Sequence, residues 1–201
     1  MTKSRLEAFS DGVVAILITI MVLELKVPHS TNLEALRPLV PVFLSYVLSF
    51  VYLGIYWNNH HHMFQLVRHV NGPILWANSH LLFWLSLVPF VTAWMGENHF
   101  APVPVALYGV VLFFSGMAYF ALSSQIIRLQ GENSSLKRAL GKATKEKLSV
   151  VMYALSVPFA FINSWVSCAI YVGIALLWLV PDTRIERHVT TTDATKNAAP
   201  H

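Results

Sequence analysis

The sequence predicts an all-α integral membrane protein with six transmembrane helices. Hydrophobic residues make up 55% of its 201 residues and charged residues only 12%, whereas a soluble domain typically carries about 25% charged residues. The hydrophobic residues gather in long runs, and roughly 20 of them form a helix that spans a bilayer. The chain is too short for an additional soluble domain, so we expect one membrane domain over residues 1–181 and a short polar cytoplasmic tail over residues 182–201.

Four apolar runs are each long enough to span the membrane with some tilt. They cover residues 10–25, 39–57, 74–94 and 103–122. Lys3 and Arg5 precede the first run, as basic residues precede a signal peptide, but no cleavage site of small residues follows it. We therefore expect the first run to be a permanent spanning helix.

The last apolar stretch, over residues 148–180, is too long for a single crossing, because a helix rises about 1.5 Å per residue. Asn163 and Ser164 near its middle predict a tight reversal and hence two short spans. Basic residues collect in cytoplasmic loops, and 12 of the 14 fall on one predicted side, leaving Lys26 and Arg37 outside. We therefore expect a multi-pass protein of the plasma membrane with both termini in the cytoplasm.

The composition argues against several other classes of protein. The net charge of +4 could suggest a nucleic-acid partner, but the basic residues lie in short loops, where they orient helices. Cys168 is the single cysteine, so no disulfide can form within the chain. The sequence contains no Gly-rich phosphate loop, nucleophile elbow or pair of carboxylates. We expect no nucleic-acid binding, no enzyme activity and no cofactor.

Polar residues within the predicted spans are functional candidates, because an ionisable group there costs at least about 2.5 kcal/mol. They cluster in the first three helices. The start of the first helix, the end of the second and the start of the third carry, in order, Arg5, Ser10 and Asp11; Asn58, Asn59, His60, His61 and His62; and Asn78, Ser79 and His80. Because the second helix ends on the side where the other two begin, these groups lie at one depth and can meet.

A helical wheel at about 100° per residue separates two faces of the first helix. Asp11 lies on about the opposite side from a stripe formed by Ile16, Thr19, Ile20 and Leu23. We expect Asp11 to reach histidine and asparagine donors of the second and third helices, which leaves the stripe for another surface. That surface is lipid, another subunit or a pore, and the pattern alone does not decide between them, although lipid is the most frequent.

Three consecutive histidines, His60, His61 and His62, raise the hypothesis of a metal site, because imidazole is the commonest metal ligand. Adjacent helical residues point about 100° apart, so the three cannot converge on one ion unless the helix unwinds. We expect a structural role instead, in which His60 or His61 hydrogen-bonds to the first helix. A membrane metal protein or enzyme that uses these histidines is the alternative, but no metal site is predicted.

The motif Arg5-x-x-x-Phe9-Ser10-Asp11 at the start of the first helix resembles the signature of the endolysosomal potassium channel family and its bacterial homologues. The resemblance covers the whole chain, which has one six-helix unit, as the bacterial members do. Residues that look like the family's polar partners of the signature stand on the second and third helices: Trp57, His60, His61 and Asn78.

The resemblance implies a potassium-permeable channel in which the first helices of several copies, as a homotetramer, line one central pore. The chain contains no Thr-Val-Gly-Tyr-Gly filter segment, and in the family bulky apolar residues of the pore helix form the constriction. A departure from the family is Gly12, where many members have Ala. The implied partners are membrane lipid, potassium ions as the permeant species and further copies of this chain. Carried onto this sequence, the narrowest ring is Ile16, accompanied by Thr19, Ile20 and Leu23.

Such a hydrophobic ring would block ions by excluding water and would conduct when it widens, so gating would be a movement of the first helix. The alternative is a proton-coupled or proton-conducting membrane transporter built from Asp11 and the histidines. Paired hydrophobic segments interrupted at matching positions in two halves of the chain would favour a transporter. The sequence contains no such pair.

Overall fold

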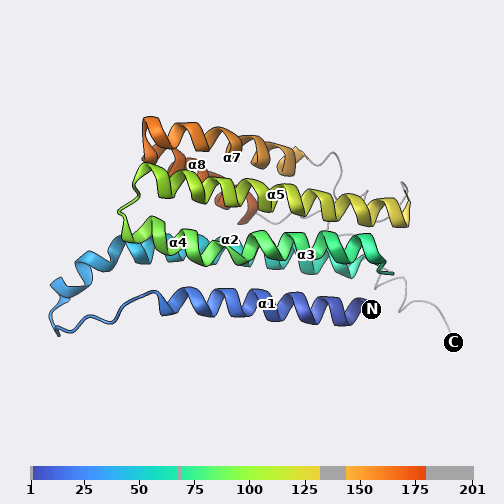
Figure 1. Cartoon of the computed structure of the whole chain (residues 1–201), viewed down its shortest axis with the longest axis horizontal. Helices are drawn as coiled ribbons and strands as arrows, with labels where there is room; N and C mark the ends of the chain where they lie inside the picture. Colours follow the sequence, from blue (N-terminus) through green and yellow to red (C-terminus); the bar gives the residue numbers. More distant parts are fainter. Residues whose placement is uncertain (1, 68, 132–143, 180–201) are drawn as a thin grey trace.

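A computed structural model of the chain describes residues 2–67, 69–131 and 144–179, and their regular structure is entirely helical. Figure 1 shows the long helices lying side by side, with the N-terminus at one end of the bundle. The elements are α1 (Lys3–Leu23), a 3₁₀ helix η1 (Leu33–Leu39), α2 (Val40–Gln65), α3 (Gly72–Ser86), α4 (Val88–Glu97), α5 (Pro102–Gln130), α7 (Thr144–Ile162) and α8 (Ser164–Leu179).

Four segments of the described chain are long and apolar enough to cross a membrane. They are α1, η1 with α2, α3 with α4, and α5. α8 is also apolar but has only 16 residues, and α7 carries Lys145, Glu146 and Lys147 in its first turn. The predicted all-helical membrane fold is therefore confirmed, with α1 and α2 extending beyond the expected bounds to Lys3 and Gln65.

The third apolar segment is not the single helix that we expected over residues 74–94. α3 ends at Ser86 and α4 begins at Val88. Pro89 has no N–H to donate to the carbonyl of Leu85, four residues earlier. The N–H of Leu87 donates to the carbonyl three residues earlier, that of Trp84 (3.2 Å), and not to the one four residues earlier as in a regular α-helix. The expected span is confirmed over Gly72–Glu97. Its division at Leu87 was not predicted, because an apolar run does not reveal whether the hydrogen bonds of a helix continue past a proline; α7 does continue past Pro158.

α7 and α8 form an antiparallel hairpin, which confirms the predicted reversal at Asn163. The N–H of Asn163 donates to the carbonyl of Phe159 (2.8 Å), and its side-chain oxygen accepts from the N–H of Trp165 (3.0 Å). Far from this turn, the indole of Trp178 donates to the hydroxyl of Ser149 (2.8 Å). The two helices are thus joined at both ends of the hairpin.

A set of buried hydroxyl groups ties α2 to the other helices. Ser49 on α2 hydrogen-bonds to Thr92 (2.6 Å) and Tyr108 (2.9 Å), and the hydroxyl of Tyr52 donates to the carbonyl of Tyr171 (2.7 Å). All five residues are at most 4% exposed. Because a spanning helix has no water to satisfy such groups, these bonds hold α2 against α4, α5 and α8.

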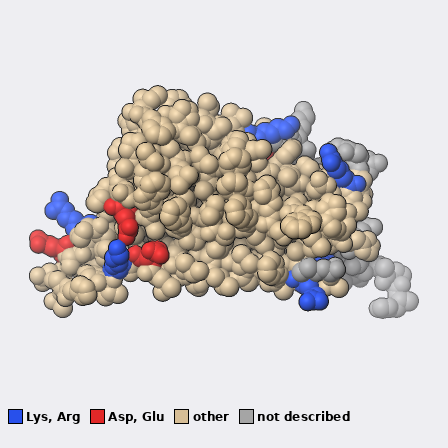
Figure 2. Space-filling model, viewed as in Figure 1, with Lys and Arg blue, Asp and Glu red and all other residues tan. Residues whose placement is uncertain are grey.

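Charged side chains gather toward the two ends of the molecule (Figure 2). At one end Lys26 forms an ion pair with Glu97 (2.8 Å), and the hydrogen bond and charge of Glu97 raise the pKa of Lys26. At the other end Lys3 donates to the carbonyl of Gln65 (3.4 Å). Outside the described residues lie the predicted tail and several basic residues assigned to the cytoplasmic side: Arg68, Lys137, Arg138, Lys142, Arg184, Arg187 and Lys196.

Candidate pore helix and its polar anchor

α1 has one buried face and one exposed face. Side chains spaced by three or four residues pack against the bundle, and each is at most 6% exposed: Leu6, Ser10, Val14, Leu17 and Met21. The other face carries Phe9, Ile16, Ile20 and Leu23, which are 56%, 57%, 41% and 78% exposed. An apolar face that one protomer leaves uncovered meets either lipid or another copy of the chain.

Three side chains from three helices form a buried hydrogen-bonded chain near the start of α1, which we call the polar anchor: Ser10, Asn78 and His60. The amide nitrogen of Asn78 on α3 donates to the hydroxyl of Ser10 (3.0 Å), and its carbonyl oxygen bonds to Nε2 of His60 on α2 (2.8 Å). Ser10 donates in turn to the carbonyl of Leu6 (2.9 Å). Asn78 is fully buried, and Ser10 and His60 are 2% and 5% exposed. The polar anchor therefore fixes α1 against α2 and α3 where water has no access.

The bonding of Asn78 determines which nitrogen of His60 carries the proton. An amide oxygen only accepts, so Nε2 of His60 carries a proton and is the donor in this bond. The ring also stacks on Phe64, with 4.4 Å between the centroids. We expected His60 or His61 to bond directly to the first helix; His60 reaches it only through Asn78.

Asp11 lies beside the polar anchor and has a different partner from the one expected. Its carboxylate accepts a hydrogen bond from the indole nitrogen of Trp57 on α2 (3.0 Å). Trp57 stacks on His61 at 5.9 Å and 19°, and His61 bonds to Gln65 (2.9 Å). The expectation that Asp11 reaches histidine and asparagine donors was wrong because Ser10, about 100° away around the helix, occupies the centre of the buried face.

The remaining motif and stripe residues lie at the surface of the protomer. Phe9 is exposed on the same side as Ile16, and Arg5 is exposed without a hydrogen bond or ion pair to any described residue. The hydroxyl of Thr19, also exposed, donates within its own helix, toward the carbonyls of Ala15 (3.1 Å) and Ile16 (2.9 Å). Only the lone pairs of the Thr19 oxygen are left to face outward.

The three histidines at the end of α2 face different neighbours. His60 bonds to Asn78 and His61 to Gln65, and His62 meets the edge of the His61 ring at 5.8 Å. Within the described ranges, no three His, Cys, Asp or Glu side chains come close enough together to hold a metal ion.

A cluster of tyrosines inside the bundle was not predicted. It joins α2, α5, α7 and α8, and its members are at most 3% exposed: Tyr52, Tyr108, Tyr153 and Tyr171. Tyrosine is common at the membrane surface, so the residue type alone does not indicate burial. The available signal was Ser45 and Ser49, four residues apart on α2, because small polar residues at helical spacing mark close helix contacts.

Comparisons with known proteins assign the family. The sequence profile described as endosomal/lysosomal potassium channel TMEM175 matches residues 5–89, from the start of α1 into α4. A potassium channel of Chryseobacterium is 56% identical over 187 residues, which are 93% of this chain and 97% of that protein. A potassium channel of Streptomyces collinus is 31% identical over 187 residues, with 88% and 91% covered.

A solved structure agrees with this assignment over most of the fold. The crystal structure of a lysosomal potassium-selective channel TMEM175 homolog from Chamaesiphon minutus has a TM-score of 0.78 at 28% identity, and the match covers 90% of this chain and 97% of that chain. The bovine endosomal/lysosomal proton channel TMEM175 is 28% identical over 150 residues, which are 66% of this chain and 31% of that protein. With near-complete coverage of its bacterial relatives, this chain belongs to the TMEM175 family of ion channels.

Proposed function

We propose that this chain is the subunit of a potassium-permeable channel in the cell membrane. Its bacterial relatives are named potassium channels, which supports potassium as the permeant ion. The proposed topology has six spans, with α7 and α8 as the shorter ones, and both termini in the cytoplasm. Four copies would arrange their α1 helices around one axis.

The exposed face of α1 is the observation that carries the proposal. Its large apolar side chains are uncovered although the opposite face of the same helix is fully packed. Copies arranged around an axis would cover this face, with Ile16 as the narrowest ring and Thr19, Ile20 and Leu23 further along the pore. A narrow apolar ring expels water and blocks ions until it widens enough for an ion to keep part of its hydration shell.

The polar anchor would set the position of this gate. Ile16 follows Ser10 by six residues, or about 9 Å along the helix axis. Val14 and Leu17 lie on the same face of α1 as Ser10 and pack against the bundle. Val14 lies between the polar anchor and the ring, and Leu17 lies next to the ring. Opening would therefore require α1 to pivot about the polar anchor rather than to slide along its neighbours.

Liposomes that contain the purified channel and a potassium gradient test this proposal. Ile16→Asn should raise potassium flux and weaken the discrimination between potassium and sodium, because an amide replaces a water-repelling side chain in the ring. Ile162→Asn makes the same change at an exposed position beside the turn between α7 and α8, and flux should stay at the wild-type level. Unchanged flux in an assembled Ile16→Asn channel would contradict the gate, and no potassium flux in the wild type would contradict the channel.

Proton conduction is the second candidate function. Vertebrate relatives are named proton channels, and the partly buried carboxylate of Asp11 lies near the start of α1. A pH-sensitive dye inside the same liposomes separates the two functions. Potassium flux at constant internal pH supports the potassium channel, whereas dissipation of an imposed proton gradient without potassium movement supports a proton pathway.

A further inference from the structure

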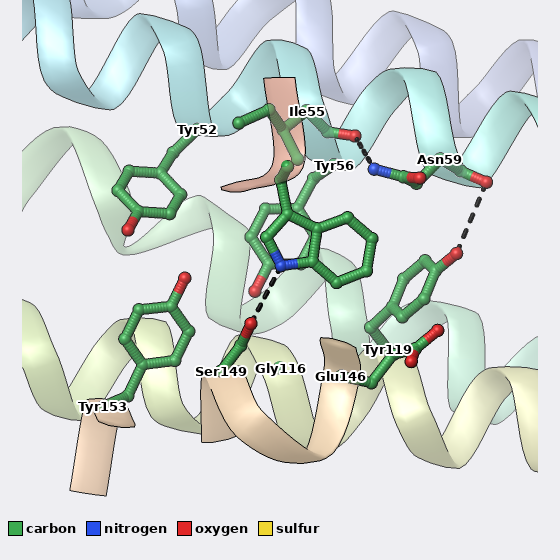
Figure 3. Close-up of a pocket in the computed structure, with 10 residues that line it drawn as sticks. Tyr52, Ile55, Tyr56, Asn59, Gly116, Tyr119, Glu146, Ser149 and Tyr153 are labelled. Atoms are coloured by element: carbon green, nitrogen blue, oxygen red, sulfur yellow. Dashed lines mark hydrogen bonds between the residues drawn. The ribbon is translucent and has the colours of Figure 1, made fainter. Parts of the chain in front are cut away.

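A half-open pocket with a volume of about 40 Å³ lies between helices of the protomer, and none of its lining residues comes from α1. Its walls come from α2, α5, α7 and α8 (Figure 3). Most of the lining is aromatic or aliphatic, with Tyr56 and Ile55 on α2, Tyr119 on α5, Tyr153 on α7 and Trp178 on α8. Neither the polar anchor nor the proposed gate uses this space.

The hydroxyl of Tyr56 distinguishes this pocket from a purely apolar void. Other polar groups of the lining are bonded: Tyr52 donates to the carbonyl of Tyr171 (2.7 Å), Tyr119 to the carbonyl of Asn59 (3.5 Å) and Trp178 to Ser149 (2.8 Å). Within the part of the chain that the structure describes, the Tyr56 hydroxyl makes no hydrogen bond, and it is accessible from the pocket rather than sealed in the core. A hydroxyl in such surroundings favours a guest that can hydrogen-bond to it.

Two further hydroxyl groups, those of Tyr52 and Tyr153, lie at one end of the pocket. In Figure 3 the hydroxyls of Tyr52 and Tyr153 point toward one another, while Asn59, Tyr119 and Glu146 lie at the opposite end. The pocket thus combines hydrogen-bonding groups with apolar walls, which is the lining expected for a small amphiphilic guest.

We infer that this pocket binds a small hydroxylic molecule: ordered water when nothing else is present, and a short-chain alcohol of two or three carbons when one is supplied. One water needs about 10–15 Å³ of such space, so about 40 Å³ accommodates roughly three or four non-hydrogen atoms, the numbers in ethanol and propanol. The hydroxyl of the guest bonds to Tyr56, and its alkyl part contacts Ile55 and the ring of Tyr119.

The position of the pocket connects it to α1 through α2. Tyr56 directly precedes Trp57, which bonds to Asp11, and lies one turn before His60 of the polar anchor. A guest between α2 and α5 therefore biases the stretch of α2 that holds α1, and occupancy changes potassium flux. This coupling rests on the proposed channel function, whereas binding in the pocket does not.

Two measurements on the purified channel test the inference separately. For binding, crystals soaked with 2-bromoethanol should show the anomalous signal of bromine between Tyr56 and Tyr119. For coupling, flux in liposomes is measured with linear alcohols from methanol to pentanol. The change in potassium flux should grow from methanol to ethanol or propanol and then become smaller, because longer chains exceed the pocket.

Variants on the lining locate the effect. A Cβ at Gly116 would lie 3.9 Å from the Tyr56 hydroxyl and 3.2 Å from Val150, so Gly116→Ala should shorten the longest effective alcohol by one carbon. Gly173→Ala, whose Cβ would meet nothing within 4 Å, should leave it unchanged. Tyr56→Phe should weaken ethanol binding roughly threefold to tenfold, the effect of one lost hydrogen bond, and keeps the test valid if Gly116→Ala fails to fold.

Two results would overturn the site: bromine bound only elsewhere, or a response that keeps rising with chain length in every variant, as partition into lipid would produce. Bromine in the pocket without any effect of alcohols on flux would support the binding site and overturn its coupling to α1. If the wild type carries no potassium flux but the bromine signal is present, the channel proposal fails and the binding site stands.

Discussion

Replacing Asn78 by Leu tests whether hydrogen bonds, rather than apolar packing alone, hold α1 in place. Leu has the same branching as Asn but no polar atom, so Asn78→Leu removes the bonds to Ser10 (3.0 Å) and His60 (2.8 Å) and keeps the site filled. His60, only 5% exposed, is left with an unpaired donor. Ser10 keeps its own bond to the carbonyl of Leu6 (2.9 Å), so the larger loss is at His60.

The expected destabilisation follows from these two losses. An unpaired buried donor costs about 1–3 kcal/mol, and a lost buried hydrogen bond costs about 0.5–1.5 kcal/mol, which together give about 2–4 kcal/mol. In a chain of this length each 1 kcal/mol lowers Tm by about 2–4 °C, so Tm should fall by roughly 4–16 °C.

Thermal unfolding of the purified protein in detergent, together with its size by gel filtration, measures this effect. Ser79→Ala is the matched control, because Ser79 is the next residue on α3 and is exposed; its Tm should stay at the wild-type value. Asn78→Leu protein with the Tm and size of the wild type would refute the argument that the polar anchor positions α1.

Three further predictions concern other contacts of the bundle. Asp11→Ala should impair assembly, measured by gel filtration, more than flux per assembled channel, because Asp11 joins α1 to α2 and lies off the exposed stripe; a normal, stable assembly would argue against this role. Gly109→Ala places a Cβ against the hydroxyl of Tyr171 and should lower the free energy of unfolding by about 1–3 kcal/mol. Gly12→Ala, whose Cβ has nothing within 4 Å, should instead stabilise α1 by up to about 1 kcal/mol. Equal Tm values for the two variants would disprove the packing argument. Lys26→Ala breaks an ion pair whose side chains are 77% and 47% exposed and should leave Tm unchanged at low and high salt; a clear drop in Tm would mean that this pair does hold the segment after α1 to α4.

The first four spans could be predicted because each lies in an apolar run long enough to cross a bilayer. The reversal at Asn163 followed from the same length argument, since residues 148–180 exceed one crossing. The break at Leu87 could not be predicted, because hydropathy does not show whether the backbone hydrogen bonds of the helix continue past Pro89. The 3₁₀ helix η1 before α2 could not be predicted for the same reason: it contains Pro38, and hydropathy does not show how a proline changes the local hydrogen bonds.

The polar anchor was predictable in its depth but not in its pairing. Depth follows from where each span begins and ends, and it brought Ser10, His60 and Asn78 to one level. Pairing depends on how α2 and α3 are rotated about their own axes, which a count of residues along each helix does not give. The stripe that contains Ile16 was predicted as a separate face, and what covers it depends on other copies of the chain.

The interruption at Leu87 gives its span an elbow. On one side of the elbow α4 is clamped to α2, where a Cβ on Gly96 would come within 2.7 Å of the Cα of Val42. On the other side α3 carries Asn78, which hydrogen-bonds to Ser10, so a movement of α1 acts directly on α3. Because Pro89 interrupts the regular ladder between the halves, bending is absorbed at this one joint. A bend at Leu87 would therefore let the polar anchor change its position while α4 stays packed against α2.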